Sequence, residues 1–153
     1  MAIPGVDAYS DPVLRYRVRA RAFIDSGEFA KLLPGASTGD PWDTKHLNRL
    51  EQAFLTTVGD EDTDMMSEDL RAGYEMFLGE GLVRLFGGEW VFLPAEMLGG
   101  EGATPGLGVQ YPGAEHLDVV TSMLPLALKF RTGRWWSSAF ITTSELLGRS
   151  GSQ

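Results

Sequence analysis

Apolar residues between positions 67 and 93 recur first at helical spacing and then at strand spacing. Six of them lie three or four residues apart, so that on a helix they form one stripe that must be buried: Leu70, Tyr74, Phe77, Leu78, Leu82 and Leu85. Gly87 and Gly88 end this pattern, because glycine readily adopts the left-handed conformation that closes a helix. The segment 89–93 follows with strand composition. We therefore predict a long helix that packs on a sheet.

The segment 14–22 alternates strictly between apolar residues and arginines, and it fits two structures. As a strand it would place four arginines on one face as a platform for anions: Arg15, Arg17, Arg19 and Arg21. As a helix it would carry two apolar stripes separated by arginine pairs: Val13, Tyr16, Ala20, Phe23 and Ile24 in one, and Leu14, Val18 and Ala22 in the other. We favour the helix, because residues 10–12 are typical of a helix start. The second stripe would then be available to another chain.

Two further helices are predicted before position 60. Ser26 can cap a short one that ends at Pro34 and Gly35. The other begins at 40–43 and continues to Gly59 with apolar residues at helical spacing. The acidic segment that follows separates this helical part, 1–59, from a helix–sheet–helix core at 67–147. We expect the chain, 1–153, to form a single domain, because its length suits one hydrophobic core.

Two more strands are expected at 107–111 and 116–121, and with 90–93 they would form an antiparallel meander. Ser122 would then cap a helix with Pro125 at its third position, and Gly133 would end it. A last helix would begin near Ser137 or Ser138. The predicted fold class is α+β, with N-terminal helices, one long central helix packed on a small antiparallel sheet of about three strands, and C-terminal helices.

Composition narrows the classes of function. The chain has 153 residues, 43% of them hydrophobic and 22% charged, and it has no cysteine. Its formal net charge of −8 argues against nucleic-acid binding, because phosphate contacts need a basic surface. The same charge would steer a basic protein partner towards it, although charge of this size also serves solubility alone. Because no leader pattern and no membrane-length apolar segment is evident, we expect a cytoplasmic protein without membrane contact.

Three residues are candidates for catalysis. His116 and Asp118 would share one face of the third strand, within reach of each other, and neighbouring hydroxyls are plentiful, but no spacing selects a nucleophile. Glu80 stands between two glycines on the long helix, where we expect it to be accessible, and precedes Arg84 by four residues, the favourable order for an ion pair. Gly73 and Gly81 flank the apolar stripe, and we expect another backbone to approach there. The alternative is that all three candidates are structural or surface groups.

Metal and cofactor sites are not predicted. The acidic run lacks the central glycine and terminal glutamate of a calcium loop, so we interpret Asp60, Glu61, Asp62 and Asp64 as solvated charges that can contact a basic partner. The glycine-rich segment 99–108 connects two strands and leads into no helix, which excludes a phosphate cradle of the usual kind. No cofactor is therefore expected.

Arg134, Trp135 and Trp136 are the best candidates for a recognition surface. Adjacent residues point in different directions, so both indoles are difficult to bury together, and tryptophan and arginine dominate the energetic centres of interfaces. The alternative is that one tryptophan belongs to the core and the other lies along the surface.

The segment 77–90, with the sequence FLGEGLVRLFGGEW, resembles small bacterial α+β domain families of unknown function, some of them similar to immunity proteins of toxin systems. The resemblance covers about residues 67–147 and implies a fold but no catalytic residue. Our first hypothesis is a non-catalytic module that binds a protein, such as an immunity or inhibitor protein for a basic partner. The alternatives are a small enzyme that uses His116 with Asp118, or Glu80, and a structural subunit of a larger or self-associating assembly.

Overall fold

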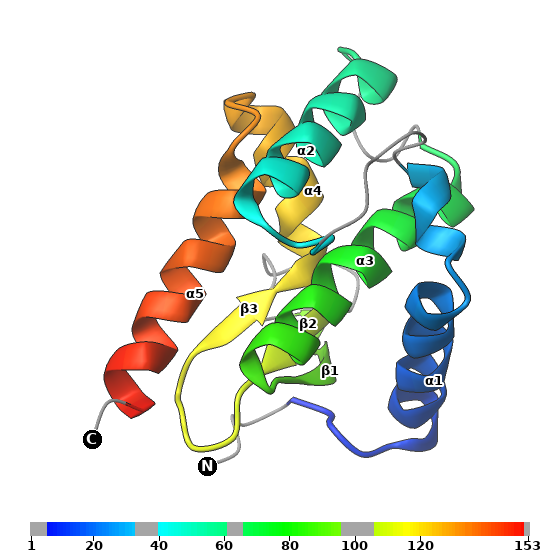
Figure 1. Ribbon diagram of the computed structural model, residues 1–153. Helices are drawn as coiled ribbons and strands as arrows, with labels where there is room; N and C mark the ends of the chain where they lie inside the picture. The colour runs from blue at the N-terminus through cyan, green and yellow to red at the C-terminus, as the bar shows by residue number, and fades with distance from the viewer. Residues whose placement is uncertain (1–5, 33–39, 61–65, 96–105, 152–153) are drawn as a thin grey trace.

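The fold is α+β, with a long central helix between two groups of shorter elements. It was obtained as a computed structural model, which describes residues 6–32, 40–60, 66–95 and 106–151. The elements are α1 (Asp11–Asp25), the 3-10 helix η1 (Glu28–Leu32), α2 (Thr44–Val58), α3 (Glu68–Phe86), β1 (Glu89–Leu93), β2 (Gly106–Gln110), β3 (Leu117–Val119), α4 (Val120–Phe130) and α5 (Trp135–Gly151). Helix α3 crosses the middle of the molecule, with α1 on one side and α2, α4 and α5 on the other (Figure 1). This arrangement confirms the predicted fold class.

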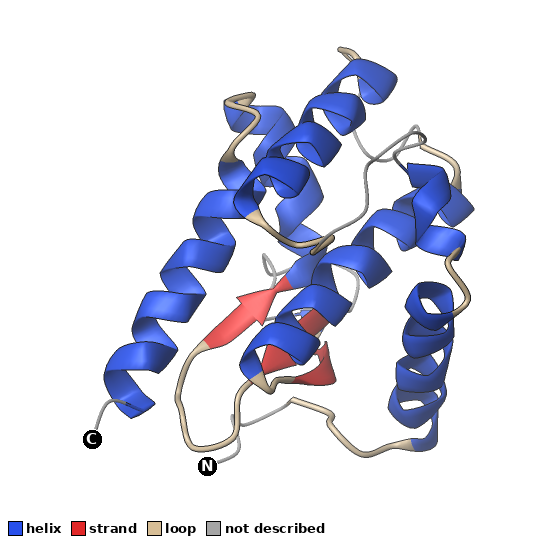
Figure 2. Cartoon of the chain, viewed as in Figure 1, coloured by secondary structure: helices blue, strands red, loops and turns tan. Residues whose placement is uncertain are grey.

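The three strands form one antiparallel sheet in the order β1-β2-β3. Trp90 of β1 pairs with Val109 of β2, and Gly108 pairs with Val119 of β3. Figure 2 shows how small this sheet is beside the helices that surround it. The third strand is shorter than predicted and ends at Val119, because Val120 and Thr121 already belong to α4.

Helix α3 has the predicted bounds and is buried on almost every side. The Ser67 hydroxyl accepts a hydrogen bond from the Leu70 amide at 3.1 Å, and Gly87 ends the helix in the left-handed conformation, with φ at 70°. All residues from Gly73 to Leu82 are buried. A helix in this position needs small residues wherever a large neighbour crosses it.

The glycines of α3 accommodate aromatic rings. A Cβ atom at Gly79 would overlap the Trp90 indole, and one at Gly81 would overlap the Trp42 indole. A Cβ atom at Gly73 would lie 3.3 Å from side-chain atoms of both Phe23 and Leu32. The expectation that another backbone approaches these glycines is therefore wrong, because aromatic and aliphatic side chains occupy those places.

Segment 11–25 is a helix, so the alternative of an arginine-bearing strand is wrong. Of its first predicted stripe, Val13, Ala20, Phe23 and Ile24 are buried, and the helix packs against α3 and β1. The Arg17 guanidinium fixes the helix to the sheet by donating to the Trp90 carbonyl at 2.9 Å. No element of the described residues packs on the second stripe, and Leu14, Val18 and Ala22 are all exposed.

Both C-terminal helices begin earlier than predicted. The Thr121 hydroxyl binds the Leu107 amide at 2.6 Å and the Leu107 carbonyl at 3.1 Å, which fixes the first turn of α4 to β2. Ser122 is therefore not the cap, and Pro125 occupies the sixth helical position rather than the third. Arg131, not Gly133, ends α4 in the left-handed conformation. Helix α5 begins at Trp135 and continues to Gly151.

Candidate functional site

Glu80 lies in the interior, contrary to the expectation that it would be accessible. The glycine on its N-terminal side lets the Trp90 indole approach α3, and the indole nitrogen donates to Glu80 Oε2 at 2.8 Å. Arg84 donates to Glu80 Oε1 at 3.0 Å, which is the ion pair predicted from the spacing. Because only 4% of Glu80 is exposed and both oxygens accept a hydrogen bond, this carboxylate is a structural contact between α3 and β1.

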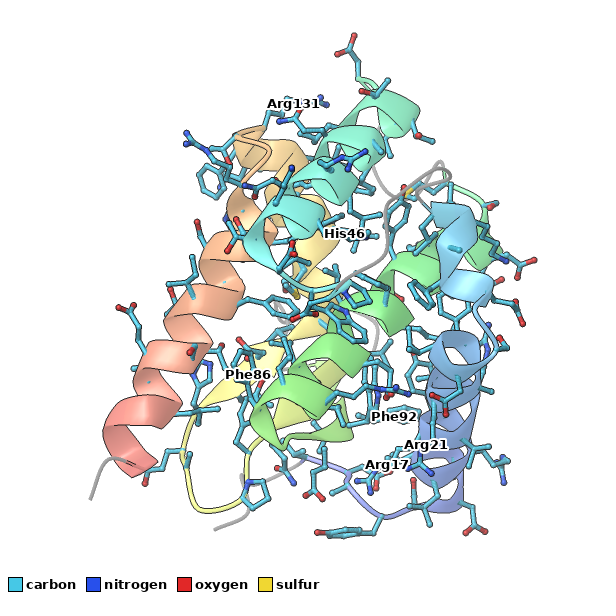
Figure 3. The ribbon with its side chains drawn as sticks, in the orientation of Figure 1. Arg17, Arg21, His46, Phe86, Phe92 and Arg131 are labelled. Atoms are coloured by element: carbon cyan, nitrogen blue, oxygen red, sulfur yellow. The ribbon has the colours of Figure 1, made fainter. Side chains whose placement is uncertain are left out.

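A hollow of about 410 Å³ lies over this pair, between α1, α3 and β1. Arg17 and Arg21 reach it from α1 (Figure 3), and Arg84 reaches it from α3, where it also binds Asp25 at 2.9 Å. Three arginines thus share the hollow with three carboxylates, those of Asp25, Glu80 and Glu89. Because these opposite charges balance, the hollow does not carry the excess of positive charge that would select an anion.

His116 and Asp118 do come together, and two hydroxyl groups join them. His116 Nε2 lies 3.2 Å from Asp118 Oδ1 and 3.1 Å from Thr143 Oγ1 on α5. Asp118 Oδ2 accepts hydrogen bonds from Thr143 at 2.8 Å and from the Tyr111 phenol at 2.6 Å. The Tyr111 and His116 rings stack at 5.8 Å. We call these four side chains the His116 cluster.

The hydrogen bonds of the His116 cluster do not activate a nucleophile. The Thr143 hydroxyl donates a hydrogen bond to the Asp118 carboxylate. The same imidazole nitrogen of His116, Nε2, faces both that carboxylate and that hydroxyl. A catalytic triad needs one imidazole nitrogen for the carboxylate and the other for the nucleophile. Thr143 is also fully buried. Burial and the neighbouring Asp118 charge raise the pKa of the Tyr111 phenol, so it remains a donor. The cluster therefore ties α5 to the sheet.

Arg134, Trp135 and Trp136 have different surroundings. Trp136 is fully buried, its indole nitrogen donates to the Met123 carbonyl at 2.8 Å, and its ring packs on Phe54 at 5.1 Å. It therefore cannot belong to an exposed recognition surface. Trp135 is half-buried and Arg134 is exposed. The alternative of one core indole and one surface indole describes the pair correctly.

Arg134 and Trp135, which remain accessible, lie in a groove between α2 and α5. It has a volume of about 700 Å³, and Arg134 and Trp135 line it together with Asn48, Asp118 and Ile141. Ile141 is 48% exposed on the open side of α5. Ser137 donates to Asn48 Oδ1 at 2.6 Å, which joins α5 to α2 across the groove floor. The geometry offers an aromatic ring, an arginine and an aliphatic side chain within one concave surface.

Sequence reasoning missed the residue that places Trp136 in the core. The carboxylate of Glu51, on α2, accepts the backbone amides of Trp135 at 3.1 Å and Trp136 at 2.7 Å. Glu51 thus caps the N-terminus of α5, because the first backbone amides of a helix find no acceptor within the helix itself. Burial raises the pKa of this carboxyl, against the opposing effect of the amides. The only signal in the sequence was an acidic residue among the apolar positions of the helix predicted to end at Gly59.

The remaining candidates lie elsewhere in the molecule. Of the acidic run, Asp60 is exposed, whereas Glu61, Asp62 and Asp64 lie outside the described residues. In the described part of the chain, no three His, Cys, Asp or Glu side chains form a group that could hold a metal ion. His46 on α2 (Figure 3) packs its ring 6.1 Å from Phe77, and burial lowers its pKa. Among the helices described, none combines the length and the apolar character needed to cross a bilayer.

Comparison with known proteins provides no assignment. No family model, curated protein or solved structure matches this chain. The resemblance to immunity-like families at 77–90 therefore stays a prediction, and functional inference depends on the geometry of the described residues.

Proposed function

We propose that this protein is a non-catalytic binding module that holds another protein in the groove between α2 and α5, in the manner of an immunity or inhibitor protein. The observation that carries the proposal is the groove itself, where Arg134, Trp135 and Ile141 remain accessible. Partly buried aromatic and arginine side chains in a concave surface are typical of the energetic centre of an interface. The three catalytic candidates, Glu80, His116 and Asp118, are each hydrogen-bonded to neighbouring side chains.

The charge distribution supports a basic partner. Helix α1 carries four arginines and two aspartates, a net charge of +2, so the rest of the chain carries −10 of the total of −8. An acidic surface of this strength would accelerate encounter with a basic protein and would lose that effect as salt increases. We place this encounter in the cytoplasm, where a chain without cysteine has no thiol to be oxidised or reduced.

The proposal is tested by capture from a lysate of the source cells with matched variants. Ile141→Lys introduces a positive charge into the groove, and Phe130→Lys makes the same change at a residue 53% exposed that does not line the groove. We expect the wild type and Phe130→Lys to enrich the same basic protein, and Ile141→Lys to lose at least about tenfold of that enrichment. Equal enrichment by the two variants would contradict the groove as the binding site.

A second candidate function uses the His116 cluster, because a histidine, a carboxylate and two hydroxyls do meet there. In that case the imidazole would have to turn its unused nitrogen towards a substrate. His116→Ala distinguishes the two functions. It leaves capture of the partner intact if the cluster is structural, and it abolishes the biological effect of the protein if the cluster is catalytic.

A further inference from the structure

Helix α1 has an outer face that no described element covers. Leu14 is 42% exposed and Val18 is 65% exposed, and Ala22 continues the same stripe one turn later. Residues four apart on a helix are neighbours, so the three form one continuous apolar strip. A shallow hollow of about 520 Å³ lies beside it, lined by Leu14, Val18, the arginines at 15 and 19, and Asp11 in the first turn of the helix. Aliphatic side chains this exposed and this regularly spaced indicate a contact surface.

Arginines flank the strip on both sides. Arg15 and Arg19 lie along one edge, and both are exposed and border the hollow. Arg17 and Arg21 lie along the other edge, where they reach towards β1. This face is therefore the basic exception on a chain whose remainder is strongly acidic.

The charges select the occupant. A second copy packed through the same face would bring together two helices that each carry a net charge of +2, which opposes a symmetric dimer. An anionic bilayer would repel the rest of the molecule, because the chain has a net charge of −8. The three aliphatic side chains also offer little area for insertion into a bilayer. A helix with an aliphatic stripe flanked by carboxylates would complement both the strip and the exposed guanidinium groups of Arg15 and Arg19 along its edge.

We infer that the outer face of α1 is a docking surface for an acidic amphipathic helix of another protein. The strip of Leu14, Val18 and Ala22 would pack on the aliphatic stripe of that helix, and Arg15, Arg19 and Arg21 would pair with its carboxylates. Because α1 is only 15 residues long, the contact is small and depends on these charges for its strength. The inference concerns a different side of the molecule from the α2–α5 groove and does not rest on it.

The test uses two synthetic helical peptides. Each has about 18 residues and a leucine stripe, with glutamate on both flanks in one peptide and lysine at the same positions in the other. Titration into the isotope-labelled protein, followed by NMR, is expected to shift the amide signals of residues 11–25 with the glutamate peptide only. Raising the salt from about 50 to about 500 mM should weaken that binding by about tenfold or more.

Matched variants locate the contact. Arg15→Glu with Arg19→Glu reverses two charges four residues apart on α1 and is expected to weaken binding about tenfold or more. Lys45→Glu with Arg49→Glu changes the net charge by the same amount at exposed positions on α2. This control should change the dissociation constant of the peptide by less than about twofold.

Four outcomes would overturn the inference. Equal binding of the two peptides would remove the role of charge, and shifts outside α1 would place the contact elsewhere. Binding to phosphatidylcholine vesicles with about a quarter phosphatidylglycerol, without binding of the glutamate peptide, would assign the face to a membrane. Loss of peptide binding with Ile141→Lys would show that the groove, not α1, had been measured, whereas failure of the groove proposal leaves the α1 result unchanged.

Discussion

Helices α3 and α1 both carry apolar stripes, yet they bury them to different extents. Helix α3 is buried from Gly73 to Leu82 and contacts its neighbours through glycines that admit Trp90 and Trp42. Helix α1 buries one stripe on α3 and β1 and leaves the other, Leu14 and Val18, exposed. The difference shows that an interior polar group such as Glu80 holds elements together, whereas the outer stripe of α1 has no described element packed on it.

The comparison is tested most strongly at Gly79. Gly79→Ala would force the Trp90 indole out of its place and disturb its hydrogen bond to Glu80, so we expect the free energy of unfolding to fall by about 3 kcal/mol or more. Gly113→Ala is the control, because that glycine has a φ of 80° but open space around it, and it should cost about 1 kcal/mol. Urea denaturation measures both, and equal losses would contradict tight packing at α3.

Glu51→Ala should have the next largest effect. It would leave the first amides of α5 buried without an acceptor, and we expect a loss of about 2 to 3 kcal/mol in the free energy of unfolding. Glu145→Ala removes an exposed carboxylate from α5 itself and should change stability by less than about 0.5 kcal/mol. A Glu51→Ala protein as stable as the control would show that α5 is held in place by packing alone.

Glu75 makes the stability of the α3 region depend on pH. Burial raises the pKa of this carboxyl to about 7 from its ordinary value of 4.5, against a smaller opposing effect of Arg71. From pH 4.5 to 7 the folded state therefore holds a proton that the unfolded state has released, so stability falls as pH rises through this window.

Glu75→Gln should remove that dependence. We expect the variant to gain about 2 to 3 kcal/mol on the wild type between about pH 4.5 and pH 8, as measured by urea denaturation at each pH. Parallel stability curves for the two proteins would contradict burial of an ionisable Glu75.

Substitution on the outer face of α1 should change the free energy of unfolding least. Val18→Ala removes an exposed side chain that contributes little to the core, so we expect the free energy of unfolding to change by less than about 0.5 kcal/mol. Ala20→Val, on the buried face of the same helix, should cost about 1 to 3 kcal/mol because there is no room for the added methyl groups. A large effect of Val18→Ala would show that its face is already covered within the chain.

Much of this fold could be predicted because its signals are local. The period of apolar residues and the glycine end at Gly87 predict α3, and the helix-start signal at residues 10–12 favoured the correct alternative for residues 14–22. The predictions failed where the position of a side chain depends on a residue far away in the sequence. Glu51 draws Trp136 into the core from 85 residues away, and Thr143 joins Asp118 across 25 residues. Spacing along the chain contains no information about such contacts.

The most direct test of the account compares His116→Ala with Ile141→Lys in one melting experiment and one capture assay. We expect His116→Ala to lower the melting temperature by about 4 °C or more, because it removes the His116 contacts with Asp118 on β3 and Thr143 on α5, and to capture the partner normally. Ile141→Lys should melt within about 2 °C of the wild type and lose the partner. The reverse pattern, with a stable His116→Ala protein that has lost its effect and an Ile141→Lys protein that retains it, would contradict the account.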